Sequence, residues 1–379
     1  MNELRRRVQW VSGSPRRVHF YNGGMLRQRE RAGRWAEVVD PYVVRPEQWP
    51  VWRTIWDSLN SWDSLLDRTG SLPHVLDVES VRPMPAFDHS FDQSLEALCL
   101  GRAREILAEQ KPIRVFWSGG IDSTLVLTSF LMAGAPLDQL ELIFTRDSVT
   151  EYPTFLSEHA PAALRRTEVT TFPHHNFVPD QRAHEFLDLP CMGDFIDPKV
   201  LNVTGGLGDK LFNSHGFLSR FKYASAFEPF ERVVPRPLIA ATEALMQASP
   251  LPIRTVSNFT WWLQLALDYQ GELLQILAGI SGASVAAQRK ALRVFYDTAG
   301  FQQWALHHRD RLATDDPARL KLEAKQIIFT YTGDERYLNE KRKSGSLKFR
   351  KTPNVAWDEP ILFILSDGSA VRPGALSST

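Results

Sequence analysis

The chain has 379 residues, no net formal charge at pH 7 and 43% hydrophobic residues, so a sizeable core and two domains are possible. This composition excludes a wholly disordered chain, and the zero net charge does not indicate a strongly acidic or basic partner. The two cysteines, Cys99 and Cys191, lack metal-ligand spacing, which argues against a disulfide framework and a zinc site.

The first 35 residues combine many arginines with the aromatic residues Trp10, Phe20, Tyr21 and Trp35. Arginine interleaved with aromatic side chains can bind nucleic acid through phosphate contacts and base stacking. A solvated β-meander is the favoured interpretation, because the rest of the chain supplies compensating acids and contains no nucleic-acid motif. No apolar run approaches transmembrane length and no apolar segment follows the basic start, so we expect a cytoplasmic protein that does not bind membranes.

Three segments divide the chain by composition. Tryptophans at helical spacing in residues 49–62 predict an apolar stripe packed in a core. A proline-rich stretch, residues 72–87, predicts a boundary, and a capped amphipathic helix follows from Ser90 to about Glu109. We therefore expect an N-terminal segment at 1–89, a main domain at 90–345 and a C-terminal tail at 346–379.

Residues 114–131 predict a buried strand, a glycine turn and an apolar helix. Gly119 and Gly120 allow the backbone torsions of a sharp turn. The unpaired N–H groups of the helix N-terminus and the hydroxyl groups of Ser118 and Ser123 would then form a phosphate cradle. Asp122 would repel phosphate by itself, so its carboxylate suggests a bridging Mg²⁺ ion.

Short apolar strands alternate with helical segments after this turn. Residues 140–145, 168–172 and 199–204 are the candidate strands, and 152–164 is a candidate helix. This alternation predicts an α/β fold with a parallel sheet that binds its ligand at the carboxyl ends of the strands. Phe144 ends the first of these strands and is expected beside the ligand.

A second glycine-rich stretch, residues 203–216, follows the last of these strands. Its glycines at 205, 206 and 208 again open a helix, with Asp209 in the first turn. Asp122 and Asp209 are therefore expected to face one magnesium ion together.

Both glycine stretches resemble one known family. Ser118-Gly-Gly-Ile-Asp-Ser123 resembles the SGGxDS signature of the PP-loop ATP pyrophosphatases, which cleave ATP between the α and β phosphates. Residues 203–216 resemble the SGxGxDELFxGY loop of the synthetase domain of asparagine synthetase and β-lactam synthetases. The resemblance covers about residues 90–345, is carried by these two motifs, and implies the parallel-sheet fold of that family with a helical C-terminal layer.

The resemblance also implies roles for individual residues. Thr204 and Gly205 would lie against the nucleotide, and Asp122 and Asp209 would bind the magnesium of Mg²⁺-ATP. Lys210 departs from the family, which has glutamate there. A glutamine-dependent asparagine synthetase begins with a catalytic cysteine after Met1, whereas this chain has Asn2, so a nitrogen source other than glutamine hydrolysis is expected.

The C-terminal third is helical by its periodicity and is expected to form a layer over the sheet that holds substrate specificity. The predicted helices are Ile239–Ala248, Val256–Ile280, Val285–Tyr296, Gln302–Leu312 and Ala318–Tyr331. Lysines in residues 340–347 occupy the place of the family's Arg-x-Lys segment. By this resemblance Lys343, with Lys341 as the alternative, would be the catalytic cation near the α-phosphate, although a solvated basic loop is an equally good interpretation. Residues 361–371 predict a strand and a tight turn.

These observations favour an ATP-dependent ligase that adenylates a small-molecule carboxylate and transfers the acyl group to ammonia or an amine. One alternative is a PP-loop enzyme that adenylates a nucleic-acid base, supported by the arginine-rich start. Another is a nucleotide-binding protein without turnover, to which Lys210 gives weight.

Overall fold

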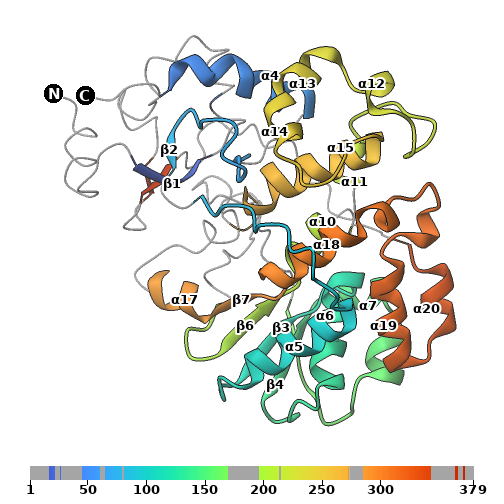
Figure 1. Ribbon diagram of the computed structural model, residues 1–379. Helices are drawn as coiled ribbons and strands as arrows, with labels where there is room; N and C mark the ends of the chain where they lie inside the picture. Colours follow the sequence, from blue (N-terminus) through green and yellow to red (C-terminus); the bar gives the residue numbers. More distant parts are fainter. Residues whose placement is uncertain are drawn as a thin grey trace.

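The computed structural model describes residues 17–21, 26, 45–59, 65–78, 81–169, 196–212, 215–271, 273, 285–342, 363–365 and 370–371. These residues form an α/β fold with two separate sheets (Figure 1). The larger sheet has five strands and positions the candidate site.

The five strands of the larger sheet are all parallel, in the order β5-β4-β3-β6-β7. Their bounds are Ile113–Phe116 (β3), Leu140–Phe144 (β4), Arg165–Glu168 (β5), Leu201–Thr204 (β6) and Leu292–Val294 (β7). Strand β3 is central, with β4 on one side and β6 on the other. Because the strands are parallel, the loops after β3, β4 and β6 lie at the same edge of the sheet. This arrangement confirms the predicted parallel sheet and brings both glycine stretches to the same edge.

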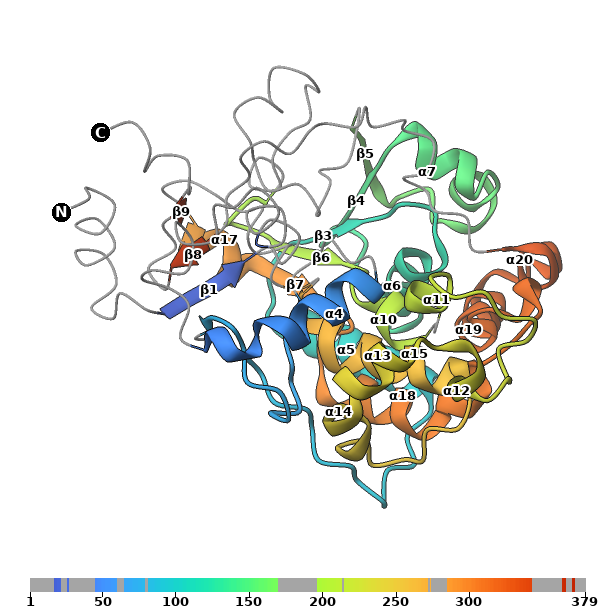
Figure 2. The ribbon, with the colours of Figure 1, turned by 90° about the horizontal axis from the view of Figure 1, so that it is seen from above.

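Helices cover the sheet. In Figure 2, α5 (Leu95–Leu107), α6 (Ile121–Met132) and α19 (Leu322–Thr332) lie on one side of β3 and β4, and α6 packs against the other two. The side chain of Ser94 accepts a hydrogen bond from the Ala97 amide and so caps α5, which confirms the predicted capped helix but begins it after Ser94 rather than at Ser90. Almost every residue of α6 is buried, which explains its lack of a polar face.

The other helical elements of this part of the chain follow β4, β6 and β7 in the sequence. They are α7 (Arg146–Glu151), η2 (Phe155–His159), α10 (Gly208–Leu211), α11 (His215–Leu218), α12 (Phe230–Val233), α13 (Arg236–Ala241), α14 (Glu243–Gln247), α15 (Val256–Leu263), η3 (Gln264–Asp268), α17 (Val285–Ala291), α18 (Ala299–Leu312), η4 (Pro317–Arg319) and α20 (Glu335–Glu340). Of these, η2 and η3 are π-helical turns. The described part of the C-terminal third is therefore largely helical, as predicted.

The smaller sheet joins the two ends of the chain. Its order is β2-β1-β8-β9, built from Arg17–Tyr21 (β1), Asp77–Val78 (β2), Phe363–Leu365 (β8) and Ala370–Val371 (β9). The predicted C-terminal strand is β8, which pairs antiparallel with β9 and with the N-terminal strand β1 (Figure 2), whereas the predicted turn lies outside the described residues.

The tryptophan stripe forms part of the core, as predicted. It lies on α4 (Trp49–Leu59), which follows the short turn η1 (Pro46–Gln48) and packs against α13. Trp52 and Trp56 are fully buried.

Three predicted elements were wrong in part. The strand expected at 168–172 lies at Arg165–Glu168, where four polar, exposed residues pair only with β4 as an edge strand. Residues 292–294 form β7 rather than the end of a helix, because their backbone pairs with β6. Residues 152–164 contain only the π-turn η2, and the helix after β4 is α7, which begins earlier, at Arg146.

Candidate functional site

The first glycine turn follows β3 directly. Gly119 has φ of 74°, and a Cβ there would lie 2.1 Å from the main-chain oxygen of Ser148 on α7. Only glycine therefore fits at this position. The Ser118 amide donates to the Ser123 hydroxyl at 3.1 Å, and Gly120 is the N-cap of α6. The turn thus aims the first amides of the twelve-residue helix α6 out of the carboxyl edge, as a phosphate cradle requires.

The second glycine loop, after β6, is pressed onto the first. A Cβ on Gly208 would lie 2.6 Å from Cγ of Asp122, and one on Gly205 would lie 3.1 Å from the Ser123 backbone. The hydroxyl of Thr204 accepts a hydrogen bond from the Gly206 amide at 3.2 Å and shapes the turn. The close approach of these two loops, which lie far apart in the sequence, explains why the second loop needs glycine at 205 and 208, whereas Gly119 of the first loop is limited by α7.

The two candidate metal ligands meet at one cation. The ammonium of Lys321 donates to one carboxylate oxygen of Asp122 and to one of Asp209. Lys321 precedes α19 in the left-handed conformation, with φ of 54°, and its side chain is only 2% exposed. Sequence reasoning identified both aspartates but missed this lysine.

Lys321 is charged in spite of its burial. Burial lowers the pKa of its ammonium, but the carboxylates of Asp122 and Asp209 raise it by more, so the pKa lies above that of an exposed lysine. The site therefore holds two negative charges and one positive charge at neutral pH.

This geometry fits a magnesium ion. Two carboxylates that reach one nitrogen atom from opposite loops can reach one hard cation at the same place. No group of three or more His, Cys, Asp and Glu side chains in the described part of the chain forms a complete metal site. Phosphate oxygens and water would supply the other ligands, as is usual for Mg²⁺ bound with a nucleotide. Asp209 is accessible for this role, with its side chain 44% exposed.

Lys210 forms an ion pair within the fold. Its ammonium lies 2.6 Å from a carboxylate oxygen of Asp268 in η3, and the two side chains are 16% and 4% exposed. The side-chain amide of Gln264, in the same π-turn, donates to the main-chain oxygen of Asp209 at 2.8 Å. Lys210, where the motif that the sequence resembles has glutamate, thus pairs with a carboxylate on η3 and helps to hold α10 in place.

Tyr296 supports the first glycine turn through a hydrogen bond to its backbone. It follows β7, is fully buried, and donates its hydroxyl hydrogen to the main-chain oxygen of Asp122 at 2.8 Å. Burial raises the pKa of this phenol well above its usual value, so the hydroxyl keeps its proton. Sequence analysis missed Tyr296 because it assigned the residue to a helix.

The structure brings Phe144 and Lys341 to the same edge of the sheet. Phe144 ends β4 next to Ile143, whose carbonyl accepts the Trp117 amide at 2.9 Å. Lys341 lies with its ammonium 2.5 Å from the Glu151 carboxylate, at the side of Gly119 that α7 covers. Lys343, the preferred catalytic candidate, lies outside the described residues, so its role stays a prediction.

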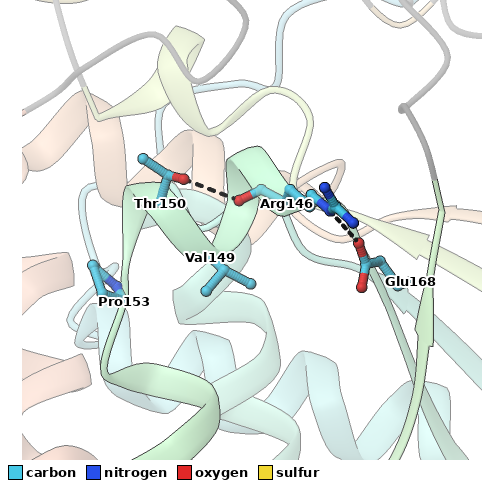
Figure 3. A pocket seen from close by; sticks show the side chains of 5 residues that line it. All are labelled: Arg146, Val149, Thr150, Pro153 and Glu168. Atoms are coloured by element: carbon cyan, nitrogen blue, oxygen red, sulfur yellow. Dashed lines mark hydrogen bonds and ion pairs between the residues drawn. The ribbon is translucent and has the colours of Figure 1, made fainter.

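A hollow of about 500 Å³ lies between α7 and β5 (Figure 3). Its lining includes Arg146, whose guanidinium pairs with Glu168 at 3.3 Å. Val149 and Thr150 also line it, whereas Ser148 and Glu151 of the same helix contact Gly119. Helix α7 therefore separates this hollow from the first glycine turn.

Three further expectations concern residues away from this edge. Cys99 is buried, and burial raises the pKa of its thiol to about 12, which leaves no thiolate for catalysis. Cys191 and most of the arginine-rich start lie outside the described residues. None of the helices described is long and apolar enough to cross a membrane.

No protein-family model matches the chain. No curated protein matches it either.

Proposed function

We propose that this protein is an ATP-dependent ligase that adenylates a carboxylate and transfers the acyl group to ammonia or an amine. The observation that carries the proposal is the convergence of Asp122 and Asp209, from two glycine loops, on one cation position. A polyphosphate held at the N-terminus of α6 would lie beside this position. The sequence resemblance to the asparagine synthetase family supports the same assignment.

The first step is adenylation. A carboxylate oxygen of the substrate attacks the α-phosphorus of ATP, the bond to the oxygen that bridges to the β-phosphate breaks, and pyrophosphate leaves. Ser118, Ser123 and the amides of the α6 N-terminus would hold the pyrophosphate. Magnesium bound by Asp122 and Asp209 would neutralise its charge.

The second step forms the amide. The nitrogen of ammonia or an amine attacks the acyl carbon of the adenylate, loses a proton, and displaces AMP. Lys321 is the buried cation nearest to the two aspartates, so we assign to it the stabilisation of phosphate charge once a metal occupies the carboxylates. Lys343 keeps its proposed role as the cation near the α-phosphate.

Pyrophosphate release tests the proposal. The purified protein is incubated with ATP, Mg²⁺, ammonium and a panel of small carboxylic acids, and pyrophosphate and AMP are measured with mass spectrometry of the acid products. We expect Asp122→Asn and Asp209→Asn each to lower the rate about 100-fold, because each loses a charged ligand of the metal.

Asp147→Asn is the matched control, since Asp147 is an exposed acid of the neighbouring helix α7. It should keep the wild-type rate. Release of ADP and phosphate in place of AMP and pyrophosphate, or wild-type turnover in either aspartate variant at limiting magnesium, would overturn the proposal. Tight ATP binding without any pyrophosphate release would instead support the nucleotide-binding protein without turnover.

A further inference from the structure

Arg68 is a buried arginine in the segment between α4 and β2, with only 4% of its surface exposed. Within the described residues, its guanidinium donates to main-chain carbonyls and to the side-chain oxygen of Gln302, at 2.8 Å, rather than to a carboxylate. A charged group without a carboxylate partner is expensive to bury. Its position therefore needs an explanation.

One set of contacts connects Arg68 with Asp209. Its Nη1 donates to the carbonyl of Leu265 at 3.3 Å, and its main-chain amide donates to the carbonyl of Ala266 at 3.1 Å. Both carbonyls belong to η3, whose π-helical hydrogen bonds displace the regular pattern of carbonyl acceptors. The preceding residue of the same turn, Gln264, donates to the main-chain oxygen of Asp209 at 2.8 Å.

A second set of contacts connects Arg68 with Asp122. Its guanidinium lies over the ring of Tyr269, 4.7 Å from the centroid. The Tyr269 hydroxyl donates to the main-chain oxygen of Tyr296 at 3.3 Å, and the Tyr296 hydroxyl donates to the main-chain oxygen of Asp122 at 2.8 Å. These contacts pass through fully buried aromatic side chains, which have little freedom to adjust.

We propose that Arg68 is a positioning residue that sets the separation of the two metal-binding aspartates. It is the described residue from which both sets of contacts start, and each set ends on the main chain of one aspartate. The N-terminal segment would thus be part of the active-site support. The statement that the two aspartates are held apart to bind a metal rests on the proposed function. The contacts of Arg68 do not depend on it.

Arg309 provides a matched control. It is also a buried arginine, 5% exposed, and it donates to two main-chain carbonyls, those of Leu251 and Pro252; unlike Arg68 it also has an exposed carboxylate, that of Asp310, 3.5 Å from its Nε. Its contacts join α18 to the loop before α15 and do not lead to either aspartate. Arg68→Met and Arg309→Met should therefore lose similar amounts of thermal stability, but only the first should affect the aspartates.

Two measurements on the full-length protein separate the alternatives. Hydrogen exchange of the peptides that cover residues 118–124 and 204–212 reports the order of both loops without any ligand. Binding of Mn²⁺ in the presence of ATP, followed by electron paramagnetic resonance, reports the metal site itself. For Arg68→Met we expect faster exchange in both peptides and Mn²⁺ binding weakened at least tenfold, with neither change in Arg309→Met.

Arg68→Lys is the second variant, in case Arg68→Met does not fold. Lysine keeps the charge but cannot span the carbonyl of Leu265 and the side chain of Gln302 at once. We expect an intermediate loss in both measurements. Exchange in the two peptides that matches Arg309→Met would overturn the positioning role. Failure of the wild-type protein to bind Mn²⁺ with ATP would overturn the proposed function. Hydrogen exchange in the two peptides would still show whether Arg68 orders both loops.

Discussion

Lys321 takes the position between two carboxylates where a divalent cation would bind. The ammonium and Mg²⁺ cannot occupy the same point, so metal binding requires Lys321 to move away from at least one aspartate. A lysine has three rotatable donors on a flexible stem, which makes such a movement feasible. The carboxylates of Asp122 and Asp209 would then bind the metal, and the ammonium would be available for phosphate oxygens.

Replacing Lys321 by methionine should destabilise the protein in a magnesium-dependent manner. Without the ammonium, two carboxylates face each other at a partly buried site. We expect the free energy of unfolding to fall by about 3 kcal/mol, at the low end of the range for a broken buried pair because Asp209 is half-exposed. Millimolar Mg²⁺ should restore a large part of this loss, as measured by urea unfolding with and without the metal.

The pH dependence of stability gives an independent check of the same pair. Folding raises the pKa of Lys321 above the 10.5 of an exposed lysine. Its stabilising contribution is therefore fully present below pH 10.5 and is lost as the pH rises through the higher pKa of the folded state. Between pH 10.5 and that higher pKa, the wild-type protein should lose stability more steeply than Lys321→Met. Parallel curves for the two proteins, or no effect of Mg²⁺ on the variant, would contradict the assigned contacts.

The second glycine loop packs directly on the first, because side chains on Gly205 and Gly208 would fill space that Ser123 and Asp122 occupy. Gly119 illustrates the steric limit best, since its missing Cβ would overlap the backbone of α7. Alanine at this position would have both an unfavourable positive φ and a clash with a main-chain oxygen that cannot rotate away.

Gly119→Ala and Gly134→Ala should separate these two effects. Both glycines have a positive φ, 74° and 76°, but a Cβ on Gly134 would have no atom within 4 Å. We expect a loss of about 1 kcal/mol for Gly134→Ala and about 3 kcal/mol for Gly119→Ala, the difference being the clash. Urea unfolding measures both, and only Gly119→Ala should also abolish pyrophosphate release. Equal losses would show that α7 yields to the added methyl group.

The ion pair between Lys210 and Asp268 joins α10 to the π-turn η3. Lys210→Glu would place two carboxylates at a largely buried contact and should lower the free energy of unfolding by about 3 kcal/mol. The double variant Lys210→Glu with Asp268→Lys restores opposite charges and should recover more than half of that loss. A double-mutant cycle by urea unfolding tests this, and an additive double variant would exclude a direct pair.

At the level of the whole molecule, the small sheet joins strands from both ends of the chain, with β1 between β2 and β8. Val18 pairs with Val78 on one side and with Leu365 on the other. Proline at this central position cannot donate to the ladder, so Val18→Pro should disrupt both pairings. Hydrogen exchange should accelerate together in the peptides that contain β2 and β8, while those of β3 and β4 stay protected. Acceleration in β2 alone would show that the two pairings are independent.

Local patterns in the sequence were sufficient to predict the first glycine turn, the strand and helix around it, and Asp122 and Asp209 as a pair. The reason is physical: a sharp turn needs glycine, a helix needs an apolar face, and parallel strands bring their carboxyl ends to one edge. The bounds of strand β5 could not be predicted, because its polar residues form a strand only by pairing with β4. The same holds for β7, whose residues have a helical sequence pattern and form a strand because they pair with β6.

The contacts that complete the site depend on residues far apart in the chain. Lys321 lies 112 residues beyond Asp209, and Arg68 lies 197 residues before the carbonyl that it binds in η3. No short-range periodicity or motif encodes such contacts, since they arise only when separately formed helices and loops pack together. Composition and spacing thus determined the parallel sheet and its two glycine loops. The packing of α19, η3 and the N-terminal segment determined which cation pairs with the two aspartates and which residues hold their main chains in place.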